Sequence, residues 1–187
     1  MDVLRMVHHT WNIAPSCGLV CFMDDETNKE MYICNPITRE YETLSTLPSP
    51  GFPMYSALAF SVDHSKSKYT ISIIQSMQAS EDFLLWNVSI HICNSIKKTW
   101  LPPVLSSMQG WRLGDVSAIC NIVLYILVSC THPNEHKNFH VLISYNLDDT
   151  EALVGVLRDE SMIPAPCALT CRRLMEVQRK LVLVGGI

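Results

Sequence analysis

The sequence has no long apolar run. Nothing in it reaches the roughly 18 consecutive apolar residues that a membrane-spanning helix needs, so no membrane partner is expected. It has no run of basic residues either, and its net charge of −4 argues against a nucleic-acid-binding surface. Charged residues make up only 17% of the chain and hydrophobic residues 48%. This composition supports a buried core rather than disorder, in a chain whose 187 residues correspond to about one domain.

Motifs for catalysis and cofactor binding are also missing. The chain contains no P-loop, no glycine pattern for dinucleotides and no identifiable Ser-His-Asp set. Three histidines, His132, His136 and His140, recur every four residues, but Pro133 and Asn134 oppose the helix that would stack them. We therefore predict a loop there, no metal site, no cofactor and no catalytic residue, and hence a protein that is not an enzyme.

Cysteine pairs with the spacing of a zinc site are absent, although the chain has eight cysteines. Cys17 and Cys21 are four residues apart, as are Cys167 and Cys171, and such pairs on a strand lie about 13 Å apart, too far to share a metal. Others lie inside apolar runs, where a free cysteine behaves as a small buried hydrophobe. Residues 1–15 lack the apolar core of a secretory signal. These features predict structural thiols and a location in the cytoplasm or nucleus.

The main positive feature is a repeated segment. Residues 33–41 read Ile-Cys-Asn-Pro-Ile-Thr-Arg-Glu-Tyr, residues 92–100 read Ile-Cys-Asn-Ser-Ile-Lys-Lys-Thr-Trp, and a weaker copy covers 143–146. In the first two copies a strand-like run ends at Ile-Cys-Asn, and an aromatic residue, Tyr41 or Trp100, follows six positions after the asparagine. We expect a strand, a turn, and an aromatic side chain that packs between repeats. The spacing of the copies is close to the period of a propeller blade, about 40–50 residues.

Short β-branched and aromatic runs separated by turn residues, without a helical stripe, predict an all-β fold. The repetition favours a propeller over a sandwich. Residues 1–16 look like a lead-in, and residues 17–187 like an incomplete β-propeller of about three to four antiparallel blades. Pro102-Pro103 is expected to end a strand that begins at Thr99. The expected units are about 17–50, 54–104, 114–158 and 163–187.

Several segments together resemble one family. They are Gly18-Leu-Val-Cys-Phe, Tyr32-Ile-Cys-Asn-Pro-Ile-Thr-Arg-Glu-Tyr, Tyr55-Ser-Ala-Leu-Ala-Phe, Ser89-Ile-His-Ile-Cys, Gly110-Trp-Arg, Pro166-Cys-Ala-Leu-Thr-Cys and Leu181-Val-Leu-Val-Gly-Gly-Ile. Their order and spacing resemble the plant F-box/kelch-repeat proteins, over nearly all of the chain after residue 13. In that family the C-terminal kelch-type propeller is the substrate receptor of an SCF-type ubiquitin ligase. The resemblance implies a kelch-type propeller and a target protein as partner. The family's F-box, which docks the Skp1 adaptor, is expected to be absent, so the chain looks like a fragment that reaches Skp1 only through an F-box elsewhere.

The resemblance implies a protein-interaction module. The alternatives are a propeller-fold enzyme, such as an oxidase or a glycan-acting enzyme, and a non-functional truncated product. Trp111 and Arg112 are the candidate partner-binding residues, because exposed Trp and Arg are common interface anchors. Trp111 could instead pack between adjacent blades. The loops near Phe83 and Trp86 could likewise bind a partner or pack between blades.

Overall fold

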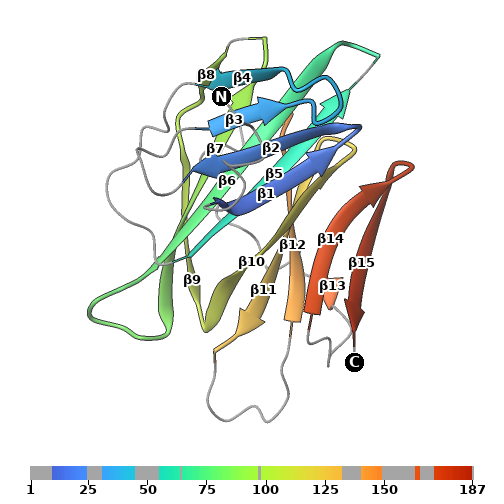
Figure 1. The fold of residues 1–187 in the computed structure, drawn as a ribbon. Helices are drawn as coiled ribbons and strands as arrows, with labels where there is room; N and C mark the ends of the chain where they lie inside the picture. The colour runs from blue at the N-terminus through green and yellow to red at the C-terminus, as the bar shows by residue number, and fades with distance from the viewer. Residues whose placement is uncertain are drawn as a thin grey trace.

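The computed structural model describes residues 10–24, 31–44, 55–63, 65–96, 98–131, 140–148, 163–164 and 171–186. Every regular element in these residues is a β-strand, and the strands form four antiparallel sheets (Figure 1). The predicted all-β class is confirmed. Within the described residues no helix is long and apolar enough to cross a membrane.

Each sheet is a meander, in which strands that follow one another along the chain pair with one another. The first sheet contains β1 (Thr10–Ser16), β2 (Leu19–Asp24), β3 (Met31–Cys34) and β4 (Tyr41–Leu44). The second contains β5 (Tyr55–Asp63), β6 (Lys68–Gln78) and β7 (Leu85–Asn94), and both β8 (Thr99–Trp100) and β9 (Val104–Gln109) pair with β7. The third contains β10 (Trp111–Cys120), β11 (Val123–Cys130), β12 (His140–Asn146) and β13 (Ile163–Pro164). The fourth contains β14 (Cys171–Val177) and β15 (Lys180–Gly186).

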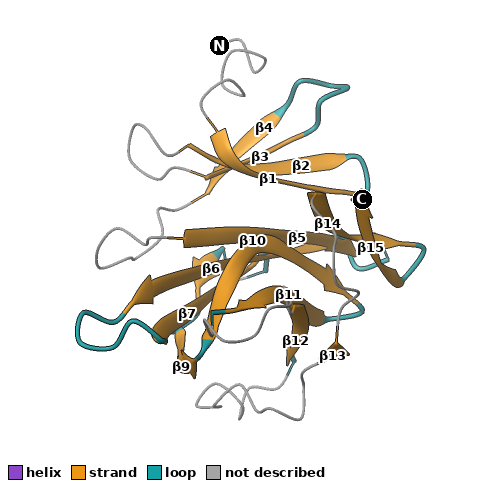
Figure 2. Ribbon diagram, turned by 90° about the horizontal axis from the view of Figure 1, so that it is seen from below, coloured by secondary structure: helices purple, strands orange, loops and turns teal. Residues whose placement is uncertain are grey.

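The sheets pack through their first strands. β5 lies against β1 on one side and β10 on the other, and β10 lies against β14 (Figure 2). A set of antiparallel sheets whose first strands lie side by side in this way is the arrangement of propeller blades around an axis. The prediction of a partial β-propeller is therefore confirmed.

The core lies between neighbouring sheets rather than within one of them. One apolar cluster joins the first and second sheets, a larger one the second and third, and a smaller one the third and fourth. Representative members are Met31, Ile33, Phe60 and Ile71 in the first cluster, Ile74, Ile90, Ile119, Leu124 and Ile126 in the second, and Ala118, Leu127 and Leu174 in the third. Strands buried on both faces carry continuous apolar runs, which explains sequences such as Met-Tyr-Ile-Cys in β3.

The repeated asparagines form the same turn. Asn35, Asn94 and Asn146 each lie at the end of the third strand of a sheet, and each accepts a hydrogen bond at Oδ1 from the backbone N–H two residues later. The distances are 3.0 Å from Ile37 N, 2.9 Å from Ile96 N and 3.1 Å from Asp148 N. An asparagine that bonds its own backbone in this way favours a turn over continued strand. The repeated segment is therefore a strand-ending device.

The first two copies also share their chain path. Arg39 N donates to Asn35 O at 2.8 Å, and Lys98 N donates to Asn94 O at 3.0 Å. Both Arg39 and Lys98 have positive φ, at 62° and 48°. The chain then pairs back onto the strand it left, in the same register in both sheets.

The aromatic residues of the two copies have different surroundings. Trp100 packs against the core between the first and second sheets, as expected. Tyr41 is half-exposed and makes an edge contact with Tyr32, on the face of the first sheet that is turned away from the second. The prediction of packing between repeats is therefore confirmed for Trp100 and is wrong for Tyr41, because no described sheet lies against that face of the first sheet.

Replacing Asn94 with alanine is expected to lower the free energy of unfolding by about 1 kcal/mol, because the Ile96 N–H loses its acceptor. Asn94→Asp is the matched control, since a carboxylate oxygen can accept the same hydrogen bond, and we expect it to retain most of the stability. Urea denaturation followed by far-UV circular dichroism measures both variants. Equal loss in the two variants would contradict the assigned role of the Asn94 side chain.

The predicted lead-in at residues 1–16 is wrong from Thr10 onward. Residues 10–16 form β1, which pairs with β2 from Thr10↔Asp24 to Ser16↔Leu19. Of the β1 side chains that the structure describes, Ile13 and Pro15 are exposed, Ser16 is partly buried and Ala14 is buried. β1 is held by its pairing with β2 and its packing against β5, and residues 10–16 alone do not indicate these neighbours. The division into four units otherwise remains a prediction.

The prediction that Pro102-Pro103 ends the fourth strand of the second unit is also wrong. The strand resumes as β9, which continues along β7. Extending the pairing Cys93↔Trp100 would place Pro103 opposite Ile90, but Val104 is found there. One extra residue is therefore accommodated at the prolines, and β8 and β9 act as one bulged outer strand. Proline is tolerated at such a bulge on an edge strand because no ladder hydrogen bond is lost.

Candidate interaction site between the first strands

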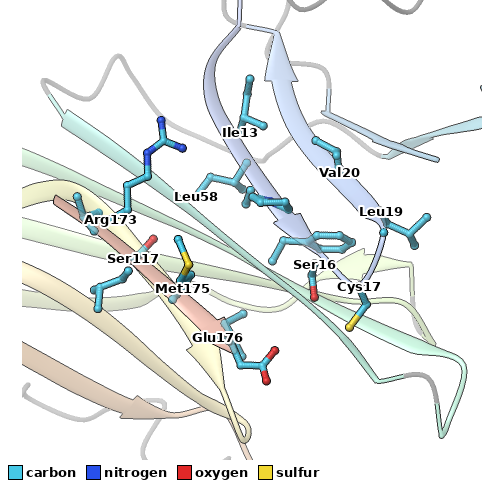
Figure 3. Close-up of a pocket in the computed structure, with 18 of the residues that line it drawn as sticks. Ile13, Ser16, Cys17, Leu19, Val20, Leu58, Ser117, Arg173, Met175 and Glu176 are labelled. Carbon is cyan, nitrogen blue, oxygen red and sulfur yellow. The ribbon is translucent and has the colours of Figure 1, made fainter. Parts of the chain in front are cut away.

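A cavity of about 770 Å³ opens where the first strands of the four sheets approach one another (Figure 3). β1 and the start of β2 form one wall, and β14 forms another. Leu58 and Phe60 of β5 and residues 116–119 of β10 line it between these walls. Each blade thus contributes its first strand, as expected for the region around a propeller axis.

Most of the lining residues are apolar, but the exposed lining surface is polar and apolar in similar measure. Ile13 and Met175 present exposed apolar side chains, and Ser16, Ser117, Arg173 and Glu176 supply the polar ones. Arg173 is exposed and forms no ion pair or hydrogen bond with any described residue. Glu176, in contrast, accepts a hydrogen bond from Arg179 N at the turn between β14 and β15. The free cation of the site is therefore Arg173, as far as the described residues go.

Hydrogen bonds at the hairpin tips join neighbouring sheets beside the cavity. Ser16 Oγ accepts a hydrogen bond from Val62 N at 3.0 Å, which joins the first and second sheets. Asn121 Nδ2 donates to Arg179 O at 3.0 Å, which joins the third and fourth. The tips of β1–β2, β10–β11 and β14–β15 are two-residue turns with positive φ at both positions, the hairpin type that matches strand twist. Cys17-Gly18 is one of them, and Gly18 adopts its φ of 81° without the steric cost that a side chain would bring.

A metal site or a reactive thiol would depend on how the described His, Cys, Asp and Glu side chains are placed. In the described part of the chain, no group of three His, Cys, Asp or Glu is placed to hold a metal ion. Burial raises the pKa of the thiols of Cys21, Cys34 and Cys93, which is the setting of structural rather than reactive cysteines. His132 and His136 lie outside the described residues, and His140 begins β12, where Ser129 Oγ is 2.9 Å from its Nδ1.

The predicted partner-binding residues do not line this cavity. Trp111 and Arg112 begin β10, at the opposite end of that strand from the 116–119 segment in the cavity wall. Trp111 is partly buried against the core between the second and third sheets, which favours the packing interpretation for its side chain. Arg112 is exposed. Their role in binding remains a prediction.

The sequence left open whether Phe83 and Trp86 are exposed for binding or packed in the core, and the structure places them differently. Phe83 is 77% exposed in the loop between β6 and β7, whereas Trp86 is 4% exposed and belongs to β7. Sequence reasoning missed Arg173 as a candidate, because its segment showed no motif. The available signal was the alternation in β14, where exposed Arg173 and Met175 flank buried Leu174.

The sheets define a class of protein: the chain provides consecutive blades of a β-propeller. Its sequence is 39% identical, over 184 residues, to an F-box/kelch-repeat protein of Arabidopsis thaliana. The match covers 95% of this chain and 44% of the relative, so the chain spans less than half the length of that protein. The predicted resemblance to plant F-box/kelch-repeat proteins is confirmed. No family model and no solved structure matches the chain.

Proposed function

We propose that this chain binds target proteins for an SCF-type ubiquitin ligase and carries out no chemistry itself. The observation that carries the proposal is the similarity to an F-box/kelch-repeat protein across 95% of the chain. The blade arrangement supports it, because propeller blades leave a lined opening at their first strands that can receive part of another protein. Contact with Skp1 would be made by an F-box and not by these sheets.

The target would enter the cavity lined by β1, β5, β10 and β14. Ile13 and Met175 offer apolar contact. The guanidinium of Arg173, which has no partner among the described residues, offers two parallel N–H donors to a carboxylate. A target segment with an acidic side chain among apolar ones fits this lining. The cytoplasm or nucleus remains the proposed location, and the free thiols of Cys17, Cys21 and Cys34 are compatible with a reducing compartment.

Arg173→Glu should reduce retention of the target by at least about tenfold, because it removes a charge-assisted hydrogen bond and adds repulsion. The experiment compares proteins retained by the tagged chain and by the variant from plant extract, using quantitative mass spectrometry. Lys180→Glu is the matched control, since Lys180 is exposed in β15 and does not line the cavity. A protein lost with Arg173→Glu and kept with Lys180→Glu is the candidate target.

The candidate is then tested for ubiquitination with the chain fused to an F-box that binds Skp1. We expect its ubiquitination to depend on both the F-box and Arg173. An unmodified candidate under these conditions would contradict the ligase role, and a retained set that does not change with Arg173→Glu would contradict the cavity as the binding site. Recovery of Skp1 by these 187 residues without a fused F-box would also count against the proposal.

A further inference from the structure

The outer edge of the second sheet is unusual among the described edges. β9 is its outermost strand and pairs with β7 on one side only. Its sequence, Val-Leu-Ser-Ser-Met-Gln, has no charged residue and no proline. By contrast, the outer strand β4 carries Glu42, which pairs with Lys98 at 2.6 Å, and β13 is two residues long and ends in Pro164. Charges, prolines, bulges and short length are the usual protection of an edge against pairing with another chain. In the bulged outer strand of the second sheet, the two prolines and the bulge lie before Val104, and the segment Val104–Gln109 itself has none of these features.

The backbone of β9 has groups that point to the open edge. Gly110 follows β9 and lies opposite Leu84 in the same register, and its N–H donates to Leu84 O at 2.8 Å. In an antiparallel pair every second residue bonds to the partner strand, so the residues of β9 that bond to β7 are those an even number of positions from Gly110. Ser106 and Met108 belong to that set, so the N–H and C=O groups of Leu105, Ser107 and Gln109 point away from β7. All three of these residues are exposed, and Leu105 is 69% exposed. The edge therefore offers regularly spaced donors and acceptors.

A structured tip lies at the end of β9. The Asp82 carboxylate accepts hydrogen bonds from Leu84 N at 2.8 Å and from Gln109 Nε2 at 3.1 Å. Gln78 Nε2 donates to Phe83 O at 2.7 Å. These bonds tie the β6–β7 loop to β9 and hold the loop backbone at Phe83 in place, so ordering that backbone on binding would cost little conformational entropy. Figure 1 shows this loop projecting beyond the second sheet.

The solvent face of this edge carries two apolar side chains, Leu105 and Met77, among polar ones, and its end is acidic. Leu105 of β9 lies opposite Ser89 of β7, and Met77 of β6 lies opposite Asn87 of β7. Ser89 and Asn87 are two residues apart on the same strand, so Leu105 and Met77 are on the same face of the sheet. Met77 is half-exposed. Residues 79–84 and 104–109 contain two carboxylates, Glu81 and Asp82, and no lysine or arginine. A strand added here would place a side chain beside Leu105 and end beside negative charge.

We propose that β9 accepts an extended segment of a partner protein as a further strand of the second sheet. The segment carries apolar side chains at alternating positions, which pack beside Leu105, and a basic residue at the end near Glu81. Main-chain hydrogen bonds to Leu105, Ser107 and Gln109 supply the affinity, as in other cases of strand addition, and the contacts with Leu105 and Glu81 supply the selectivity. This surface is the outer edge of the blade and goes beyond the target-binding cavity at the first strands.

The test uses the full chain and a fluorescent synthetic peptide, Lys-Val-Thr-Val-Thr-Val. Fluorescence anisotropy measures binding, and amide hydrogen exchange locates it. We expect exchange to slow at Leu105, Ser107 and Gln109, with little change at Ser106 and Met108, whose N–H groups already bond to β7. Ser107→Pro should weaken binding about tenfold, because it removes an outward N–H and places a ring in the edge, while the pairing with β7 is kept.

Ser107→Ala is the matched control and should bind like the original chain, since its backbone N–H remains. If Ser107→Pro alters the far-UV circular dichroism spectrum, Leu105→Lys replaces it and should weaken binding while leaving the fold unchanged. Peptide binding that is unaffected by a folded edge variant, or exchange protection elsewhere, overturns the proposal. Sedimentation showing a dimer that Ser107→Pro dissociates also overturns it, because the edge would then be occupied by a second copy of this chain.

Discussion

Replacing Ile126 with alanine is expected to lower the free energy of unfolding by about 2–5 kcal/mol. Ile126 is 0% exposed in the middle of β11 and belongs to the apolar cluster between the second and third sheets. The two sheets meet there through side chains, so their backbones cannot close the space that the lost carbons leave. The cost therefore includes the cavity as well as the lost transfer of apolar surface from water. For a chain of this size the melting temperature should fall by roughly 4–20 °C.

Two controls bracket this result. Ile126→Val removes one methylene and should cost about 0.5–1.5 kcal/mol. Ile37→Ala removes as many carbons as Ile126→Ala, but from a side chain that is 87% exposed, and it should change stability by less than about 0.5 kcal/mol. Urea denaturation followed by circular dichroism gives all three values. Similar losses for Ile126→Ala and Ile37→Ala would mean that the sheets are not packed through Ile126.

Replacing Trp86 with alanine is expected to cost about 3–5 kcal/mol, the usual range for a large buried aromatic side chain. Trp86 lies in β7 between Gln78 of β6 and Met108 of β9, and only 4% of it is exposed. Its removal would leave a void at the point where the outer strand β9 is held to the sheet. Thermal unfolding followed by circular dichroism measures the loss.

Phe83→Ala is the comparison for Trp86→Ala, because Phe83 is also aromatic and only three residues away, yet is 77% exposed. It should leave stability within about 0.5 kcal/mol of the original chain. The pair thus separates a structural aromatic residue from one that is available for contact. A large loss in Phe83→Ala, or a small one in Trp86→Ala, would contradict the burial that distinguishes them.

The parts of the fold that could be predicted depend on local chemistry. Asn35 and Asn94 mark strand ends because each side chain bonds to a backbone group two residues away. The turn at Asn121 depends on local chemistry as well, since asparagine tolerates the positive φ of 50° found there. The candidate site could not be predicted in this way. Arg173 belongs to it only because β14 lies against β10, and no feature within residues 171–177 indicates that neighbour.

The sequence by itself determined the all-β class, the repeat and the turns that end the third strands, because strand alternation and asparagine turns act over a few residues. The tertiary structure alone decided that residues 10–16 are a strand, that Trp86 is buried and Phe83 exposed, and that β9 continues past two prolines. It also decided which side chains line the cavity between the first strands. The physical reason is that burial and edge exposure depend on which strands become neighbours in space, and residues that meet across sheets are far apart in the chain.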